Sequence, residues 1–240
     1  MGIFKNLFDD FTIHARIMPA LITALPTYIY LMIVGIIEFG FIDIICNSWI
    51  FILLVAIYYR FIRNLGKKYE EKMYKVLGGK PTTIILRYSD DNIDEITKTR
   101  YHKKLNKKIV NLNLPLDKEH EKIEDDVKYE SAINWLRNYA NTNREKEQRV
   151  YQELKEYNFY RNLYGGKIII ILSGIVCVVT TVIKVIMEII KSIEIYKMYI
   201  IYIIFMLCIL LLSCLIINKE SVVKKAFDYA KTLLEVCERL

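Results

Sequence analysis

The chain lacks the short motifs that mark the commonest catalytic and phosphate-binding sites. It contains no G-x-S-x-G, no H-E-x-x-H, no G-x-G-x-x-G and no glycine-rich loop ending in Lys-Ser/Thr. Its three histidines, His14, His102 and His120, are far apart in the sequence. These absences argue against an enzyme of a familiar class. A membrane-bound enzyme with an unrecognised site near the acidic Glu124–Glu130 is the weakest of three hypotheses.

Cysteine is sparse and has no ligand-like spacing. The five cysteines form no C-x-x-C pair, and no group of Cys and His has the spacing of a metal site. They are Cys46, Cys177, Cys208, Cys214 and Cys237, four of them in or beside apolar stretches. We expect these side chains to fill small apolar spaces, and we expect no metal and no cofactor.

Four stretches contain little or no charge. They are residues 17–37, 44–59, 168–190 and 198–217, and Phe41 and Ile42 can lengthen the short second one. A helix of about 20 apolar residues spans a bilayer core of roughly 30 Å. The sequence therefore predicts an all-α membrane protein with four transmembrane helices in two hairpins, 17–62 and 167–217; three spans are the alternative, because the second stretch is the weakest.

The remaining segments flank or separate the two hairpins. Residues 1–16 predict an interfacial amphipathic helix, 63–166 a mainly helical cytosolic domain, and 218–240 a cytosolic amphipathic helix that packs on this domain or on a neighbouring subunit. We expect the second span to continue as helix to Leu77. We also expect a strand or extended segment at Lys80–Ser89 and a turn at Gly165–Gly166 before the third span.

Lysine and arginine gather at one end of the four spans. They are Arg60, Arg63, Lys67, Lys68, Arg161, Lys167, Lys219, Lys224 and Lys225. The linker 38–48 has none, and the linker 188–197 has Lys191 and Lys197 against Glu188 and Glu194. The positive-inside rule then places both termini and the middle segment in the cytoplasm of a bacterial inner-membrane protein. The net charge of +7 reflects a Lys-rich composition typical of an AT-rich genome and, to a greater extent, this topology. The charge that remains is compatible with a polyanionic partner but does not demonstrate one.

The third span carries a polar stripe at steps of three and four residues. Its members are Ser173, Cys177, Thr180, Thr181, Lys184 and Glu188, and Thr23 and Thr27 form a second stripe on the first span. Ionisable groups at membrane depth are functional candidates, so these residues are candidate pore-lining positions. The alternative is that neighbouring helices seal them.

The densest basic segment lies at residues 98–108. With basic residues elsewhere it supplies candidate phosphate contacts: Arg87, Lys98, Arg100, Lys103, Lys104, Lys107, Lys108, Arg137, Arg144 and Arg161. Candidate rings for stacking on bases are Tyr101, Trp135, Phe159 and Tyr160. A nucleotide or single-stranded DNA is the predicted ligand, and a solvated or membrane-facing surface is the alternative.

Four segments, PTTIILRYSDD, TRYHKKL, YESAINWLRN and YNFYRNLYGGK, resemble landmarks in a set of bacterial membrane proteins. The architecture is similar to that of membrane effectors of nucleotide-signal antiphage systems, in particular the Hailong type. This resemblance implies an oligomeric ion channel whose cytosolic crown domain binds a single-stranded DNA oligomer that holds it shut, and a partner nucleotidyltransferase. It assigns no role to an individual residue.

The leading hypothesis is a homo-oligomeric inner-membrane channel gated by a ligand on its cytosolic domain. Four spans are too few to enclose a wide pathway in one subunit, so the pore would lie on a symmetry axis, with a tetramer favoured. Membrane lipid is the other expected partner. The second hypothesis is a non-conducting scaffold that recruits a cytosolic partner to the membrane.

Overall fold

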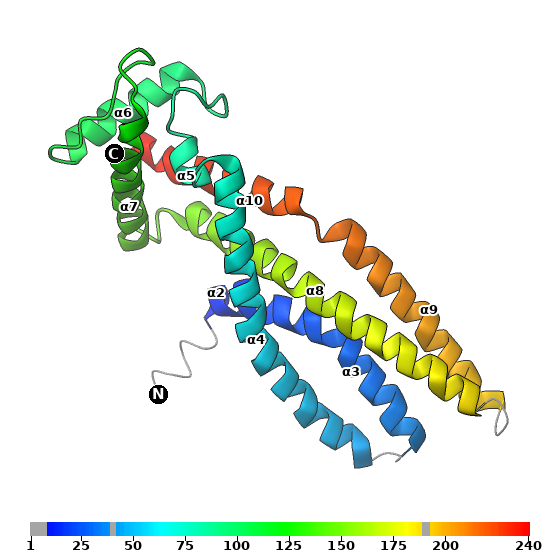
Figure 1. The fold of residues 1–240 in the computed structure, drawn as a ribbon. Coiled ribbons are helices and arrows are strands. Elements are labelled where there is room, and N and C mark those ends of the chain that lie inside the picture. Colours follow the sequence, from blue (N-terminus) through cyan, green and yellow to red (C-terminus); the bar gives the residue numbers. More distant parts are fainter. Residues whose placement is uncertain (1–8, 39–41, 189–192) are drawn as a thin grey trace. The chain divides into compact units, whose positions relative to one another are not determined.

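The computed structural model describes residues 9–38, 42–188 and 193–240 (Figure 1). All regular structure in these ranges is helical, and they contain no strand. The chain divides into two compact units. The first comprises Met1–Tyr69 and Asn158–Ser221, and the second comprises Glu70–Tyr157 and Val222–Leu240.

The first unit is built from long apolar helices. They are α3 (Met18–Glu38), α4 (Ile42–Leu77), α8 (Gln148–Glu188) and α9 (Ile193–Ile216), of which α4 and α8 each also contribute one end to the second unit. By length and composition, four helical stretches can cross a membrane: Asp10–Ile33, Ser48–Ile84, Gln148–Met187 and Tyr199–Ile216. The prediction of four spanning helices is confirmed at this level.

The chain is already helical seven residues before the predicted start of the first span. The side chain of Asp9 accepts a hydrogen bond from the Thr12 amide at 2.9 Å and caps α2 (Asp10–Thr12). A π-helical turn, η1 (Ile13–Ile17), joins α2 to α3 without a break. Residues 1–8 of the expected interfacial helix lie outside the part of the chain that the structure describes.

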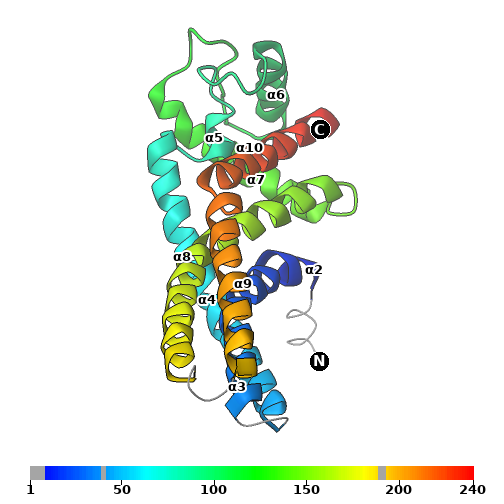
Figure 2. The same cartoon turned by 90° about the vertical axis from the view of Figure 1, so that its right-hand side faces the viewer.

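Side chains from α3, α8 and α9 form the core of the first unit. Cys177 of α8 packs with Tyr202 and Met206 of α9, and residues of α3 cover this cluster. The ring centroids of Tyr30 and Tyr202 are 5.9 Å apart. Figures 1 and 2 both show α8 and α9 running side by side.

The helices α4 and α8 touch backbone to backbone at two glycines. A Cβ atom added at Gly165 would lie 2.5 Å from the Gly66 nitrogen, and one at Gly66 would lie 2.8 Å from the Arg161 carbonyl oxygen. A Cβ atom at Gly166 would collide with the hydroxyl of Thr23 on α3. The expected turn at Gly165–Gly166 is wrong, because α8 continues through both residues; these glycines permit close packing instead.

Replacing Gly165 with Ala should destabilise the first unit. The new methyl group meets main-chain atoms of α4, which cannot rotate away, and overpacking of this kind costs about 1–3 kcal/mol. Gly174→Ala is the matched control, because its Cβ would lie 2.8 Å from Cδ2 at the end of the flexible Leu210 side chain. Thermal unfolding of the purified protein in detergent should show a clearly larger drop in melting temperature for Gly165→Ala than for Gly174→Ala. Equal losses would contradict a backbone contact at Gly165.

The second unit is a group of shorter helices around an apolar centre. They are α5 (Pro81–Ile84), α6 (Glu95–Lys108), η2 (Ile123–Asp125), α7 (Asp126–Thr142), most of α10 (Lys219–Glu235) and η3 (Val236–Arg239). Leu105, Ile133, Leu136, Leu233 and Val236 are almost fully buried. The C-terminal helix therefore packs within its own chain.

The segment Lys80–Ser89 is not a strand, and this prediction is wrong. Pro81 occupies the first turn of α5, where its missing N–H is harmless, and the amide of Ile84 donates to the Lys80 carbonyl at 2.9 Å. The described ranges contain no strand with which this segment could pair. As expected, α4 ends at Leu77, followed by Gly78 with a φ of 75°.

Candidate functional site

The basic segment lies in α6, and two of the predicted ligand residues lie on the buried face of this helix. Asp94 caps this helix by accepting a hydrogen bond from the Thr97 amide at 2.8 Å. Lys98 and Tyr101 are buried, whereas Lys103, Lys107 and Lys108 are exposed. Neither Lys98 nor the ring of Tyr101 is therefore accessible to a ligand.

Lys98 and Arg87 have structural partners inside the second unit. The Lys98 ammonium donates to the carbonyl oxygen of Arg87 at 2.6 Å and to that of Asp90, and burial lowers its pKa. The Arg87 guanidinium donates to both carboxylate oxygens of Asp126, at 2.9 and 2.6 Å, and to the Gly78 carbonyl. Asp126 and the Gly78 carbonyl thus already occupy the Nε and Nη2 donors of Arg87.

Arg87 also lines a pocket of about 400 Å³ whose charge is mixed. The lining residues are Gly78, Arg87, Ser89, Glu121, Lys122, Asp126 and Tyr129. Here the Tyr129 hydroxyl donates to Glu121 at 2.6 Å, which with burial raises the pKa of the phenol. The two carboxylates make this pocket a poor site for an anion.

Arg100 and Lys104 lie on the exposed side of α6, against the C-terminal turn η3. Arg100 donates from Nε and Nη2 to one carboxylate oxygen of Glu238, at 3.0 and 2.6 Å. Lys104 donates to the Glu238 carbonyl at 2.9 Å and lies 3.5 Å from its other carboxylate oxygen. Figure 2 shows the C-terminal end of the chain beside α6.

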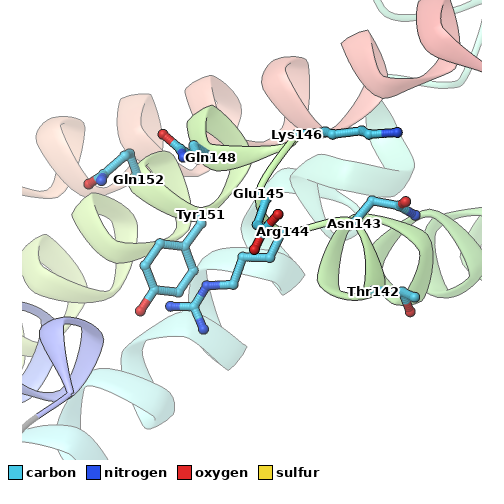
Figure 3. Close-up of a pocket in the computed structure, with 8 residues that line it drawn as sticks. All are labelled: Thr142, Asn143, Arg144, Glu145, Lys146, Gln148, Tyr151 and Gln152. Atoms are coloured by element: carbon cyan, nitrogen blue, oxygen red, sulfur yellow. The ribbon is translucent and has the colours of Figure 1, made fainter.

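A larger pocket, of about 660 Å³, lies where α7 ends and α8 begins (Figure 3). Its lining residues are Thr142, Asn143, Arg144, Glu145, Lys146, Gln148, Tyr151 and Gln152. The guanidinium carbon of Arg144 lies 3.5 Å from the centroid of the Tyr151 ring, a close cation–π contact. Of the predicted ligand residues, only Arg144 lines this pocket.

The other predicted residues are spread over both units. In the second unit, Trp135 stacks on Tyr139 with ring centroids 5.5 Å apart, and Arg137 donates to the Thr82 hydroxyl at 3.3 Å. Phe159, Tyr160 and Arg161 belong to the first unit, where the first two rings meet edge to face. Arg161 is only 8% exposed. Within the second unit, neither Trp135 nor Arg137 is among the residues that line the two pockets described above.

Some members of the two polar stripes, on the third and first spans, are buried between helices of the same chain. Thr23 and Thr181 are completely buried, and their hydroxyls donate to carbonyls of their own helices, those of Pro19 at 2.8 Å and Cys177 at 2.7 Å. Cys177 is 4% exposed. These three residues pack between helices, so they do not line a pore shared between protomers.

The remainder of the stripe is half-buried. Ser173, Thr180, Lys184 and, on α3, Thr27 share this intermediate exposure, and the side chain of Glu188 lies outside the described residues. The fully exposed face of α8 is apolar and includes Leu172, Ile175, Val176, Val179, Ile183 and Met187. A membrane protein presents such a face to lipid or to another protomer.

Sequence reasoning missed the contacts that the C-terminal turn makes. The guanidinium of Arg239 pairs with the buried Glu147 of the α7–α8 connection, and Arg149 pairs with Glu235 at 3.0 Å. The partners are far apart in sequence, so no local pattern indicates them. The tail was recognisable only as amphipathic.

No metal site is indicated in the part of the chain that the structure describes. No group of three or more His, Cys, Asp or Glu residues there has a suitable arrangement. Cys177 and Cys237 are buried, Cys208 and Cys214 are exposed, and all four are free thiols. The side chain of Cys46 is not among those described.

The chain matches no protein-family model, no curated protein and no solved structure. The class of protein is therefore inferred from the fold alone. All-helical architecture with four helices long and apolar enough to cross a bilayer indicates a multi-pass membrane protein.

His102 should make the second unit less stable in mild acid. Its ring is fully buried, with Nδ1 2.6 Å from the Pro115 carbonyl and Nε2 3.1 Å from that of Leu86. Burial lowers its pKa below 6.5, against the pull of these carbonyls and of Glu121. Below a pH of about 6.5 the unfolded chain therefore binds a proton at His102 more readily than the folded chain does, and the free energy of unfolding falls.

The measurement is thermal unfolding at pH 7.5 and 5.5, followed by Trp135 fluorescence in a Trp49→Phe background. His102→Gln should show a smaller loss on acidification than the parent. His120→Gln is the control and should lose more stability on acidification than the parent. The hydrogen bond with Asp117 raises the pKa of His120, so this residue stabilises the folded chain when it is protonated. An identical acid loss in the parent and in His102→Gln would contradict the expectation.

Proposed function

We propose that the protein is a homo-oligomeric inner-membrane channel, favouring a tetramer, whose cytosolic helical unit binds a nucleotide or single-stranded oligonucleotide and controls conduction. The observation that supports control is the continuity of two helices. Both α4 and α8 run from a membrane-spanning stretch into the second unit without a loop. A continuous helix can convey a movement from one end to the other, which a simple anchor does not require.

In this proposal the spans form two hairpins, α3–α4 and α8–α9, and both termini face the cytoplasm. The exposed side chains of Arg60, Lys67, Lys68, Lys219 and Lys224 support this orientation by the positive-inside rule. A role in antiphage defence, with a partner nucleotidyltransferase, rests on the sequence resemblance alone.

The pocket around Arg144 and Tyr151 is the preferred ligand site. Its volume of about 660 Å³ suits a nucleotide-sized ligand. Arg144 and Lys146 offer positive charge for phosphate, the Tyr151 ring offers a stacking surface, and Gln148 offers hydrogen bonds to a base edge. In this pocket two cations, Arg144 and Lys146, stand against the single carboxylate of Glu145, whereas in the Arg87 pocket two carboxylates balance two cations.

Arg144→Ala and Tyr151→Leu should each weaken binding of fluorescent ATP or a labelled oligothymidylate by about 5- to 100-fold, since a stacking contact is worth about 1–3 kcal/mol. Arg149→Ala is the matched control, because Arg149 pairs with Glu235 and does not line the pocket. Fluorescence anisotropy with the full-length protein in detergent measures the affinities. If neither variant differs from this control, the pocket is not the site.

A pore would be lined by the half-buried edge of α8, at Ser173, Thr180 and Lys184. Thr181 is excluded by its burial. Lys184→Ala combined with Thr180→Leu should therefore change single-channel conductance or ion selectivity in planar bilayers by at least twofold. Val179→Leu, on the exposed apolar face, is the control and should conduct like the parent.

The second candidate is a non-conducting scaffold, which the burial of Thr23, Cys177 and Thr181 favours. In this case the polar stripe serves helix packing, and the membrane unit only holds the second unit at the membrane. Absence of current from the purified parent protein, with and without ATP or oligonucleotide, would support the scaffold and contradict the channel.

A further inference from the structure

The carboxylate of Glu238 occupies a position on α6 that is built like an oxyanion site. Arg100 approaches one carboxylate oxygen with two nitrogens, and Lys104 lies beside the other. The same fork of donors recognises phosphate oxygens equally well. Both cations are substantially exposed, with side chains 49% and 33% accessible, so an external anion can reach them.

This position lies at one end of a longer basic stripe. Arg100, Lys103, Lys104 and Lys107 are connected by steps of three and four residues along α6 and face away from the buried Leu105, and Lys108 lies at the edge of this stripe. Glu238 is the carboxylate that the structure pairs with members of this stripe. Lys103, Lys107 and Lys108 remain exposed beside it, leaving an excess of positive charge.

The turn that carries Glu238 is held in place independently of that side chain. Its neighbours Val236 and Cys237 are fully buried, and Arg239 pairs with the buried Glu147. The Glu238 side chain can therefore leave α6 while the turn stays folded. Exposed ion pairs are weak, so a multivalent phosphate compound can replace this single carboxylate.

We propose that the α6 stripe is a phosphate-binding site which the chain's own Glu238 carboxylate blocks, so that the C-terminal turn competes with phosphate-bearing ligands. This inference adds a regulatory site to the ligand-binding part of the proposed function, on which it rests, but it does not require conduction. The ligand is identified by its chemistry as phosphate groups, carried either by a soluble polyanion or by acidic lipid headgroups.

The test is Glu238→Gln in the full-length protein in detergent, with inorganic tripolyphosphate as the probe in calorimetric titrations. Removing the internal carboxylate should tighten binding about 3- to 10-fold, and the gain should shrink as salt is raised from 50 to 200 mM. Glu235→Gln is the matched control, since it removes a C-terminal carboxylate that pairs with Arg149 instead. It should leave the affinity unchanged.

Adding Arg100→Gln and Lys104→Gln to Glu238→Gln should abolish the gain. Unchanged or weaker binding by Glu238→Gln, with a melting temperature like that of the parent, would overturn the proposal. So would an equal gain in Glu235→Gln. These binding results do not depend on current measurements. If Glu238→Gln binds tripolyphosphate more tightly but the protein does not conduct, the channel proposal is refuted and the phosphate-site proposal is supported.

A second arm distinguishes the two sources of phosphate. The parent and Glu238→Gln are placed in nanodiscs of phosphatidylcholine, with or without phosphatidylglycerol. If phosphatidylglycerol abolishes the increase in tripolyphosphate affinity that Glu238→Gln causes, lipid headgroups occupy the stripe. If the gain persists, the stripe serves a soluble ligand. A gain that is missing in detergent and in both kinds of nanodisc would again overturn the proposal.

Discussion

The close contact between Gly66 and Gly165 is the constraint on which the first unit depends. It brings α4 and α8 into main-chain contact, and Gly166 brings Thr23 of α3 against the same part of α8. Asn162, one turn earlier in α8, donates to the Ala15 carbonyl at 2.6 Å and ties the start of the first span to this crossing. With the helices this close, the polar groups beside the crossing are covered by protein.

The second unit uses several of its basic residues internally. Arg87 pairs with Asp126, Lys98 bonds to main-chain carbonyls, and Arg100 contacts Glu238. These residues therefore count toward the net charge of +7 although each already has a partner within the unit. Lys103, Lys107 and Lys108 of α6 are exposed.

Much of the helical framework could be predicted from the sequence, because apolar runs and capping residues such as Asp94 act locally. The Lys80–Ser89 segment could not, since its β-branched composition suggests a strand while strand formation depends on a distant partner. For the same reason the spacing of Thr181 and Lys184 predicted a stripe but not which neighbours cover it. The pairing of Glu238 with Arg100 joins residues 138 positions apart, beyond any local pattern.

The unbroken length of α8 has a geometric consequence. Its 41 residues extend about 60 Å at 1.5 Å per residue, roughly twice the thickness of a bilayer core. A straight helix of this length that crosses a bilayer cannot lie wholly within the hydrocarbon core, so part of α8 must continue beyond it. The main-chain hydrogen bonds of the helix continue across that boundary without a break.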